Sequence, residues 1–222
     1  MDMFLYLFYS FAYLSLLIWS TSVSPQNKLW SFLSIIYLVL IGLILDNTVI
    51  AAGRIIGEGD FLETLNLLRF WSHALITPTL VLYSFGVLRA AEIKGMNKKR
   101  ALNIAMLFTL ILIFIEIRTE VIGLELGPLW EYGVLRYVPI EALNGAPFMI
   151  LLVTLTLIAA GILLWIKNGW AWMFIGAFVM TLGSMIPIPI NSSAITNGFE
   201  LILLILLVAT KRHLEQTNNF QI

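Results

Sequence analysis

Residues 29–52, LWSFLSIIYLVLIGLILDNTVIAA, decide the fold, because this run of 24 residues contains a single charged side chain, Asp46. A helix that crosses the hydrocarbon core of a bilayer needs about 20 mostly apolar residues. Six further segments meet this requirement, at residues 3–20, 70–90, 101–118, 147–166, 170–188 and 194–210. The sequence therefore predicts an all-α, polytopic membrane protein, a seven-transmembrane-helix bundle formed by one domain that spans residues 1–222.

The composition points to the same class of protein. Of the 222 residues, 60% are hydrophobic and 12% are charged, and the mean hydropathy is +0.94. A soluble domain of this size could not bury so much apolar surface in one core. The chain has no Cys, which excludes disulfides, thiolate metal sites and a cysteine nucleophile. With two His residues, a multi-histidine zinc site is not expected.

The distribution of Lys and Arg predicts the orientation, because cytoplasmic loops retain these residues. With seven helices, nine of the 13 Lys and Arg residues fall on the side of the C-terminus, and 11 of the 13 acids fall on the other side. We therefore expect a multi-pass protein of the plasma (inner) membrane with its N-terminus outside and its C-terminus in the cytoplasm. Residues 3–20 could be a signal peptide, but the apolar run is long and no basic residue precedes it, so we expect retention. Cleavage would leave six helices.

Polar residues gather in the stretch 46–78, DNTVIAAGRIIGEGDFLETLNLLRFWSHALITP, between two apolar segments. Asp60 and Glu63 have the spacing of a helix-start pair, which places the beginning of the third helix near Phe61, before the apolar segment at 70–90. From there one helical stripe continues through Glu63, Asn66, Arg69, His73, Thr77 and Ser84. Such a stripe would be very unfavourable against lipid, so we expect it to face the interior of the bundle.

Two features of this stretch interrupt regular structure. Pro78 cannot donate a hydrogen bond to the carbonyl four residues earlier, which predicts a kink beside His73. The glycines between residues 53 and 59 permit a turn, but no strand precedes them and no Gly-Lys-Ser/Thr follows, so no nucleotide is expected. Retinal is not expected either, because the last predicted helix has no lysine before Lys211, at its inner end.

Acids also lie at the outer ends of two later helices. Glu116 and Glu120 are four residues apart and share one helical face. Asn197 and Glu200 occupy the start of the last predicted helix in a similar way. The outer connection between the fourth and fifth helices, residues 121–146, contains aromatic residues and prolines, and we expect it to be a structured outer loop with a short helix.

These groups predict an acidic cup at the outer end of the bundle. The expected ligand-binding residues are Asp46, Asn47, Arg69, His73, Glu116, Glu120, Asn197 and Glu200. Carboxylate oxygens suit Ca²⁺, Mg²⁺ or Mn²⁺, so a divalent cation is the candidate cofactor, with Asp46, His73, Glu116 and Glu120 as its ligands. The first functional hypothesis is that the cup binds or conducts a cation, a proton or a small polar ligand.

A membrane-embedded hydrolase that acts on a lipid is the second hypothesis. In it, His73 is a general base or metal ligand oriented by Asp46 or a glutamate, and Ser72, Ser193 or a bound water is the nucleophile. Against this hypothesis, Ser72 and His73 are adjacent and point to different helical faces, and no nucleophile elbow is present.

The third hypothesis is a structural or assembly subunit without a ligand. Asp46 then pairs with Arg54 or Arg69, and His73 bonds to the carbonyl that Pro78 frees. The expected partners are membrane lipids and either a partner membrane subunit or a second copy of the chain. The basic inner loop, residues 89–100, is expected to attract anionic lipid, and no nucleic acid is expected.

Overall fold

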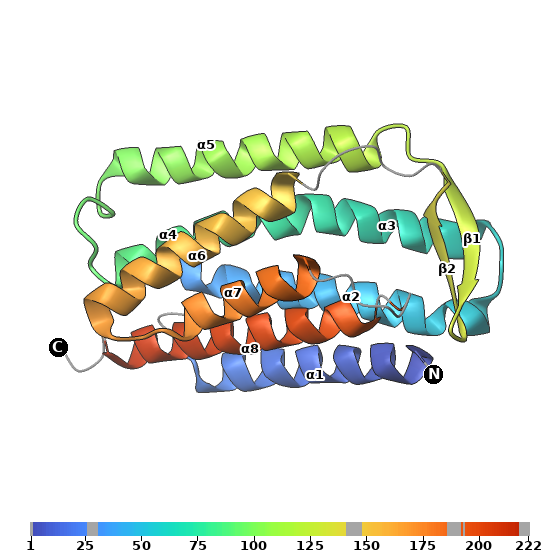
Figure 1. Cartoon of the computed structure of the whole chain (residues 1–222), viewed down its shortest axis with the longest axis horizontal. Helices are drawn as coiled ribbons and strands as arrows, with labels where there is room; N and C mark the ends of the chain where they lie inside the picture. Colours follow the sequence, from blue (N-terminus) through green and yellow to red (C-terminus); the bar gives the residue numbers. More distant parts are fainter. Residues whose placement is uncertain (1, 26–30, 141–147, 186–191, 193, 218–222) are drawn as a thin grey trace.

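The computed structural model describes residues 2–25, 31–140, 148–185, 192 and 194–217, and it is a bundle of long helices with a β-hairpin at one end (Figure 1). The helices are α1 (Asp2–Val23), α2 (Ile35–Ile56), α3 (Asp60–Ile76), α4 (Leu80–Ala90), α5 (Lys99–Glu116), α6 (Phe148–Asn168), α7 (Trp172–Met185) and α8 (Ala194–Thr217). The hairpin consists of β1 (Leu126–Glu131) and β2 (Val134–Pro139). Short 3-10 turns at Phe32–Ser34 and Thr77–Thr79 lead into α2 and join α3 to α4, and a π-helical turn at Ile117–Val121 continues α5.

Six helices in the described part of the chain are long and apolar enough to cross a membrane: Asp2–Val23, Phe32–Ile56, Asp60–Ala90, Lys99–Val121, Phe148–Asn168 and Ala194–Thr217. They coincide with six of the seven predicted segments. The remaining segment, predicted at 170–188, contains α7, which has 14 residues. At 1.5 Å per residue α7 is roughly 21 Å long, shorter than the hydrocarbon core of about 30 Å. The predicted end of this segment, at residue 188, lies outside the described residues.

Successive passes of the chain run in opposite directions, so each end of the bundle collects alternate connections (Figure 1). The end that holds the N-terminus, the α2–α3 connection and the hairpin is called the acidic end. Its acids in the described chain are Asp2, Glu58, Asp60, Glu63, Glu125 and Glu131, with Asp46, Glu116, Glu120 and Glu200 further along the helices. The opposite end is called the basic end, and its cations are Arg89, Lys94, Lys98, Lys99, Arg100, Lys167, Lys211 and Arg212.

The core lies among α1, α2, α4, α6, α7 and α8. Tyr6 and Tyr13 are seven residues apart on one face of α1, and both are buried. Tyr83 of α4 is also fully buried, and its hydroxyl donates a hydrogen bond of 2.7 Å to the carbonyl oxygen of Leu207 in α8. A buried tyrosine hydroxyl needs such a partner, so these residues tie the helices together as well as filling space.

The start of α3 is one residue from the predicted position, but the predicted cap is wrong. Asp60 is the first helical residue and its side chain makes no capping hydrogen bond. The residue before it, Gly59, is the N-cap, and its carbonyl oxygen accepts a hydrogen bond from the backbone N–H of Glu63 at 3.1 Å. Further along, Pro78 lies in the 3-10 turn between α3 and α4, in keeping with the interruption that a proline predicts.

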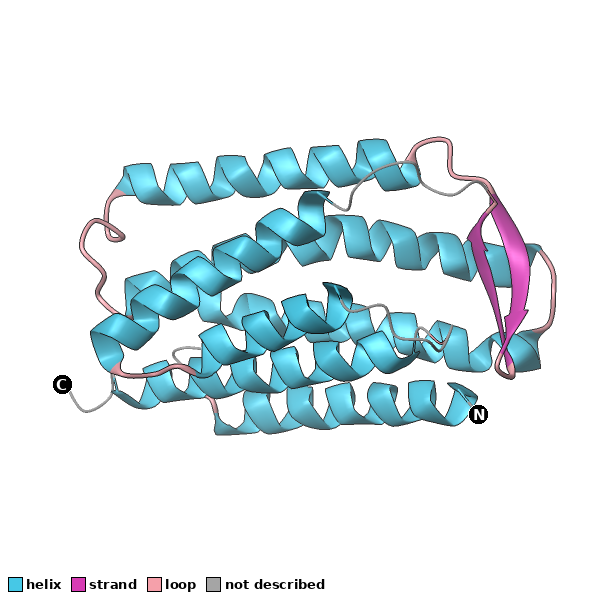
Figure 2. Cartoon of the chain, in the orientation of Figure 1, coloured by secondary structure: helices cyan, strands magenta, loops and turns pink. Residues whose placement is uncertain are grey.

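The connection between α5 and α6 contains an antiparallel hairpin, where the sequence predicted a short helix (Figure 2). Leu126 pairs with Pro139, and Glu131 pairs with Val134. The two-residue turn is Tyr132-Gly133, and both residues have positive φ, 45° and 84°, as favoured two-residue hairpin turns require. Leu135 is fully buried against the ends of α2 and α3. Leu135 and Tyr137, two residues apart and so on one face of β2, are both buried there, as a strand requires.

Gly53 of α2 allows the hairpin to dock. A Cβ at this position would lie 1.8 Å from the carbonyl oxygen of Leu135, far inside the contact distance. Gly42 lies earlier in α2 and faces α3. A Cβ added to Gly42 would lie 3.1 Å from Cδ1 of Ile76 and 3.3 Å from Oγ of Ser72. Small residues on α2 thus allow close approach both to a helix and to a strand.

Candidate functional site

An ion pair between α2 and α3 forms one wall of the candidate site. The Nε of Arg69 donates a hydrogen bond of 2.8 Å to Oδ1 of Asp46. The Nη1 of the same guanidinium donates to Oδ1 of Asn66 at 2.6 Å, and Asn66 donates in turn to the carbonyl oxygen of Leu62 at 2.8 Å. Because Asn66 is fully buried, its amide holds the guanidinium in position against the aspartate.

A second group of polar side chains lies one turn further along α3. The Nδ1 of His73 and Oγ1 of Thr77 form a hydrogen bond of 3.1 Å. The Nε2 of the same ring lies 3.9 Å from Oε1 of Glu116 on α5. The side chain of Glu116 is 8% exposed, whereas that of His73 is 43% exposed. The histidine ring therefore lies between a hydroxyl on its own helix and a carboxylate on the neighbouring one.

These groups line one cavity of about 300 Å³, which we call the acidic cavity. Its lining residues come from α2, α3, α5 with its π turn, and α6: Asp46, Arg69, Phe70, His73, Glu116, Glu120 and Ile150. Five of the eight residues predicted as ligand-binding are thus brought together from helices far apart in the sequence. Among the described lining residues, three carboxylates face one guanidinium.

The other three predicted residues do not line the acidic cavity. The amide of Asn197 donates to Oδ1 of Asn47 at 2.7 Å, and Asn47 donates to the carbonyl oxygen of Leu43 at 2.9 Å. This contact links α2 to α8. Glu200 is half-buried on α8 and has no ion-pair partner in the described part of the chain. Asn47 points about 100° away from Asp46 on α2, and its side chain is bonded to Asn197 of α8 instead of lining the acidic cavity.

The predicted divalent-metal ligands do not form a metal-binding group. Within the described ranges, no set of three or more His, Asp and Glu side chains is arranged to hold a metal ion. Two of the predicted ligands already have other partners: Asp46 accepts a hydrogen bond from Arg69, and one ring nitrogen of His73 is hydrogen-bonded to Thr77. The carboxylates of Glu116 and Glu120 remain, and both are contributed by one helix and its continuation.

The nucleophiles of the predicted hydrolase are not found at the acidic cavity. Ser72 is directed at α2, with its Oγ 3.3 Å from a Cβ position at Gly42. Its neighbour His73 lines the cavity instead. Ser193 lies outside the described residues. A bound water is then the nucleophile that remains for this hypothesis.

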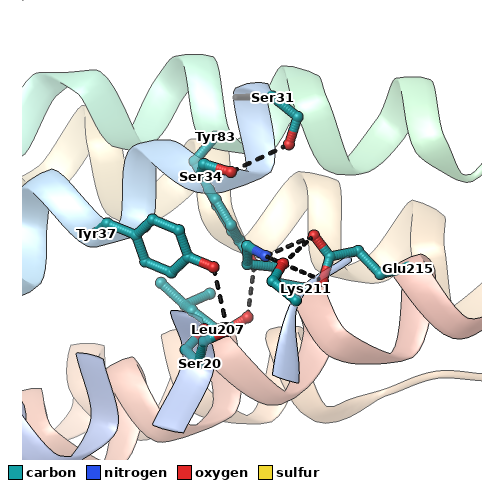
Figure 3. A network of polar contacts seen from close by, with 9 residues as sticks. Ser20, Ser31, Ser34, Tyr37, Tyr83, Leu207, Lys211 and Glu215 are labelled. Carbon is teal, nitrogen blue, oxygen red and sulfur yellow. Dashed lines mark hydrogen bonds and ion pairs between the residues drawn. The ribbon is translucent and has the colours of Figure 1, made fainter. Parts of the chain in front are cut away.

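A buried ion pair at the basic end was missed by the sequence analysis, which placed Lys211 at the end of the last helix. Because α8 continues to Thr217, Lys211 lies inside the helix and is 1% exposed. Its Nζ donates to Oε1 of Glu215 at 2.5 Å and to Oγ of Ser24 at 2.6 Å, and it lies 5.0 Å from the ring centre of Tyr37 (Figure 3). The spacing of four between lysine and glutamate is a signal that could have predicted this pair.

Comparison with other proteins gives no independent indication of function. No protein-family model, no curated protein and no solved structure matches the chain. The function is therefore argued from the geometry of the acidic cavity.

Proposed function

We propose that the protein is a membrane protein whose acidic cavity binds a small organic cation, such as an alkylammonium ion. The observation that carries this proposal is the excess of carboxylates around the cavity. Arg69, the cation among the described lining residues, is already bonded to Asp46 and Asn66. Glu116 and Glu120 form no hydrogen bond with the described residues, so their oxygens are available to a positively charged guest.

The size and the donor set favour an organic cation over a divalent metal ion. Ca²⁺ takes six to eight oxygen ligands and Mg²⁺ requires near-octahedral geometry, which two glutamates on one helix do not supply. An ammonium group has three N–H donors, and Glu116 and Glu120 together offer enough acceptors for it. A volume of about 300 Å³ lies at the lower end of the range for small-molecule pockets.

Binding is favoured over conduction by the packing between the acidic cavity and the basic end. Leu112 of α5 and Val87 of α4 are fully buried, and Val81 of α4 is nearly so. They belong to one continuous apolar core. A permeating ion would need free polar groups along its path. The buried hydroxyls in this part of the core, on Tyr83, Ser84 and Thr109, already donate to backbone carbonyl oxygens.

The proposed setting is the plasma membrane, with the acidic end outside. A cation from the outer solution would then be attracted to the acids around the α2–α3 connection and the hairpin before it enters the acidic cavity. Protons compete with a cation for carboxylates, so lowering the pH is expected to weaken binding.

Thermal unfolding of the purified protein in detergent tests this proposal, with ethylammonium chloride compared against sodium chloride at equal ionic strength. At ten times its dissociation constant a ligand stabilises by about 1.4 kcal/mol, which raises the midpoint by roughly 3–6 °C for a chain of this size. Glu116→Gln and Glu120→Gln should each remove most of this shift. Glu125→Gln, a matched change outside the acidic cavity, should leave it intact.

Three results would contradict cation binding at this site. The first is an equal shift in sodium chloride, and the second is a shift that persists in both glutamine variants. The third is a thermal midpoint that no alkylammonium salt changes, in a protein whose glutamine variants differ from it only in their midpoint without added salt. That third result is the one expected of a structural or assembly subunit.

A further inference from the structure

A second and larger cavity lies at the basic end, among α1, α2, α4 and α8. We call it the basic-end cavity; its volume is about 1550 Å³. Apolar side chains form most of its walls, including Ile18 of α1, Leu38 and Ile41 of α2, and Leu214 of α8. Pockets for small molecules typically measure about 300–1,000 Å³, so this cavity has room for a larger, mainly apolar guest.

Polar and charged residues also line the cavity, and they come from each of the surrounding elements: Thr21, Ser22, Ser31, Ser34, Tyr37, Arg89, Glu92, Asn97 and Glu215. The hydroxyl oxygens of Ser31 and Ser34 lie 3.3 Å apart, and Asn97 and Arg89 come from the other side of the cavity. Arg89 is exposed and forms no ion pair with a described residue. Apolar walls with a polar, hydrogen-bonding rim match a molecule that has an apolar tail and a polar head.

The charge around this rim favours an anionic head. The chain from residue 89 to residue 100 carries Arg89, Lys94, Lys98, Lys99 and Arg100, against the single acid Glu92. All six side chains are exposed. A cluster of this kind beside a membrane helix attracts anionic lipid. Arg89 can also bind a phosphate through two parallel N–H donors.

The buried ion pair of α8 forms part of the same wall. Glu215 and Tyr37 line the basic-end cavity, and behind them Lys211 is held by Glu215 and Ser24 (Figure 3). Because the charge of Lys211 is neutralised inside the protein, it does not compete with Arg89 for an anionic head. The wall that it supports also presents no uncompensated charge to an apolar tail.

We infer that the basic-end cavity binds an anionic phospholipid from the surrounding bilayer. An acyl chain lies along Leu38 and Ile41, and the phosphate accepts hydrogen bonds from Arg89 and from the polar rim. This site is separate from the acidic cavity, and it requires the membrane setting but not the binding of a cation.

The test uses full-length protein purified in a non-ionic detergent. Phosphatidylglycerol or phosphatidylcholine with the same acyl chains is added, and both the thermal midpoint and the number of bound lipids, by native mass spectrometry, are recorded. We expect phosphatidylglycerol to raise the midpoint more and to remain bound at one copy per chain. Arg89→Gln should remove the preference for phosphatidylglycerol. Ile41→Trp, at a position 52% exposed where the larger ring fills the cavity, should remove the bound copy of either lipid.

Matched controls separate this site from general effects of charge and volume. Lys167→Gln removes a cation at the same end without touching the cavity, and Ile111→Trp enlarges an exposed isoleucine on α5. Both should bind lipid as the unmodified protein does. The inference is overturned if the two lipids bind and stabilise equally, or if the bound phosphatidylglycerol survives in Ile41→Trp. Because native mass spectrometry counts lipid on folded molecules, a lower midpoint in a variant does not obscure the result.

Discussion

Two adjacent residues of α2, Asp46 and Asn47, have different roles because a helix separates their directions by about 100°. Asp46 turns to α3 and pairs with Arg69, whereas Asn47 turns to α8 and accepts from Asn197. From the sequence, Asp46, Asn47, Arg69 and Asn197 were all predicted to belong to one ligand-binding site. Their division into an acidic cavity and an interhelical contact follows from the direction of each side chain.

The Asp46–Arg69 pair gives the clearest prediction for a single residue. Asp46→Asn leaves the guanidinium of Arg69, whose side chain is 12% exposed, without its carboxylate. Removing one partner of a buried pair costs about 3–5 kcal/mol, but the side chain of Asp46 is 31% exposed, so we expect about 1–3 kcal/mol. The free energy of unfolding, measured by denaturant titration in mixed micelles, checks this value.

The control for this prediction is Asp60→Asn, which changes an exposed aspartate without an ion pair in the described chain. It should change the free energy of unfolding by less than about 0.5 kcal/mol. The pair does not stabilise the fold if Asp46→Asn is no more destabilising than this control. Combining Asp46→Leu with Arg69→Met should recover stability relative to either change alone, since no charge is then left unpaired.

At the scale of elements, long apolar runs were predicted well and the connection between them was not. Six membrane-length helices coincide with apolar segments, because the requirement to cross a bilayer constrains both length and composition. Their ends are less well predicted, since α8 continues to Thr217, past the predicted end at residue 210. The hairpin was missed because the prolines and aromatics of residues 121–146 predicted a structured loop with a short helix. The signal for it is the glycine of Tyr132-Gly133, in a two-residue connection that precedes a short run with Val134, Tyr137 and Val138, since valine and tyrosine are favoured in strands.

The docking of the hairpin depends on Gly53 and gives a prediction for this element. Gly53→Ala should separate β2 from α2, since a methyl group would meet the carbonyl oxygen of Leu135 at 1.8 Å. We expect a loss of about 1–3 kcal/mol and faster hydrogen exchange in residues 126–139. Hydrogen exchange followed by mass spectrometry measures both the location and the extent of the change.

Gly198→Ala is the matched control, because the nearest atom to its added methyl group is the hydroxyl oxygen of Tyr9 at 3.3 Å. Exchange in the hairpin should be unchanged in this variant. If the hairpin exchanges hydrogen at the same rate in Gly53→Ala and in Gly198→Ala, the close approach of Gly53 to Leu135 does not hold the hairpin in place.

At the scale of the whole molecule, opposite charges gather at opposite ends of the bundle, and this separation predicts its orientation. The chain has no Cys, so single cysteines can be introduced as unique labels. In intact cells, a membrane-impermeant maleimide should label Glu125→Cys at the acidic end. It should label Lys98→Cys at the basic end only after the membrane is permeabilised. The reverse pattern would place the acidic cavity on the cytoplasmic side.

The sequence by itself determined that the chain is a helical membrane-type protein, where six of its helices lie, and that polar residues collect near one end. These properties depend on the composition and spacing of residues within single segments, and the thickness and apolarity of a bilayer constrain both. Only the tertiary structure decided that Asp46, Arg69, His73, Glu116 and Glu120 share one cavity, and that Asn47, Asn197 and Glu200 do not. It also decided that Lys211 is buried with Glu215 beside a large apolar cavity. Such groupings depend on the rotation of each helix about its axis and on contacts between residues far apart in the chain. The residue pattern within one segment determines neither of these.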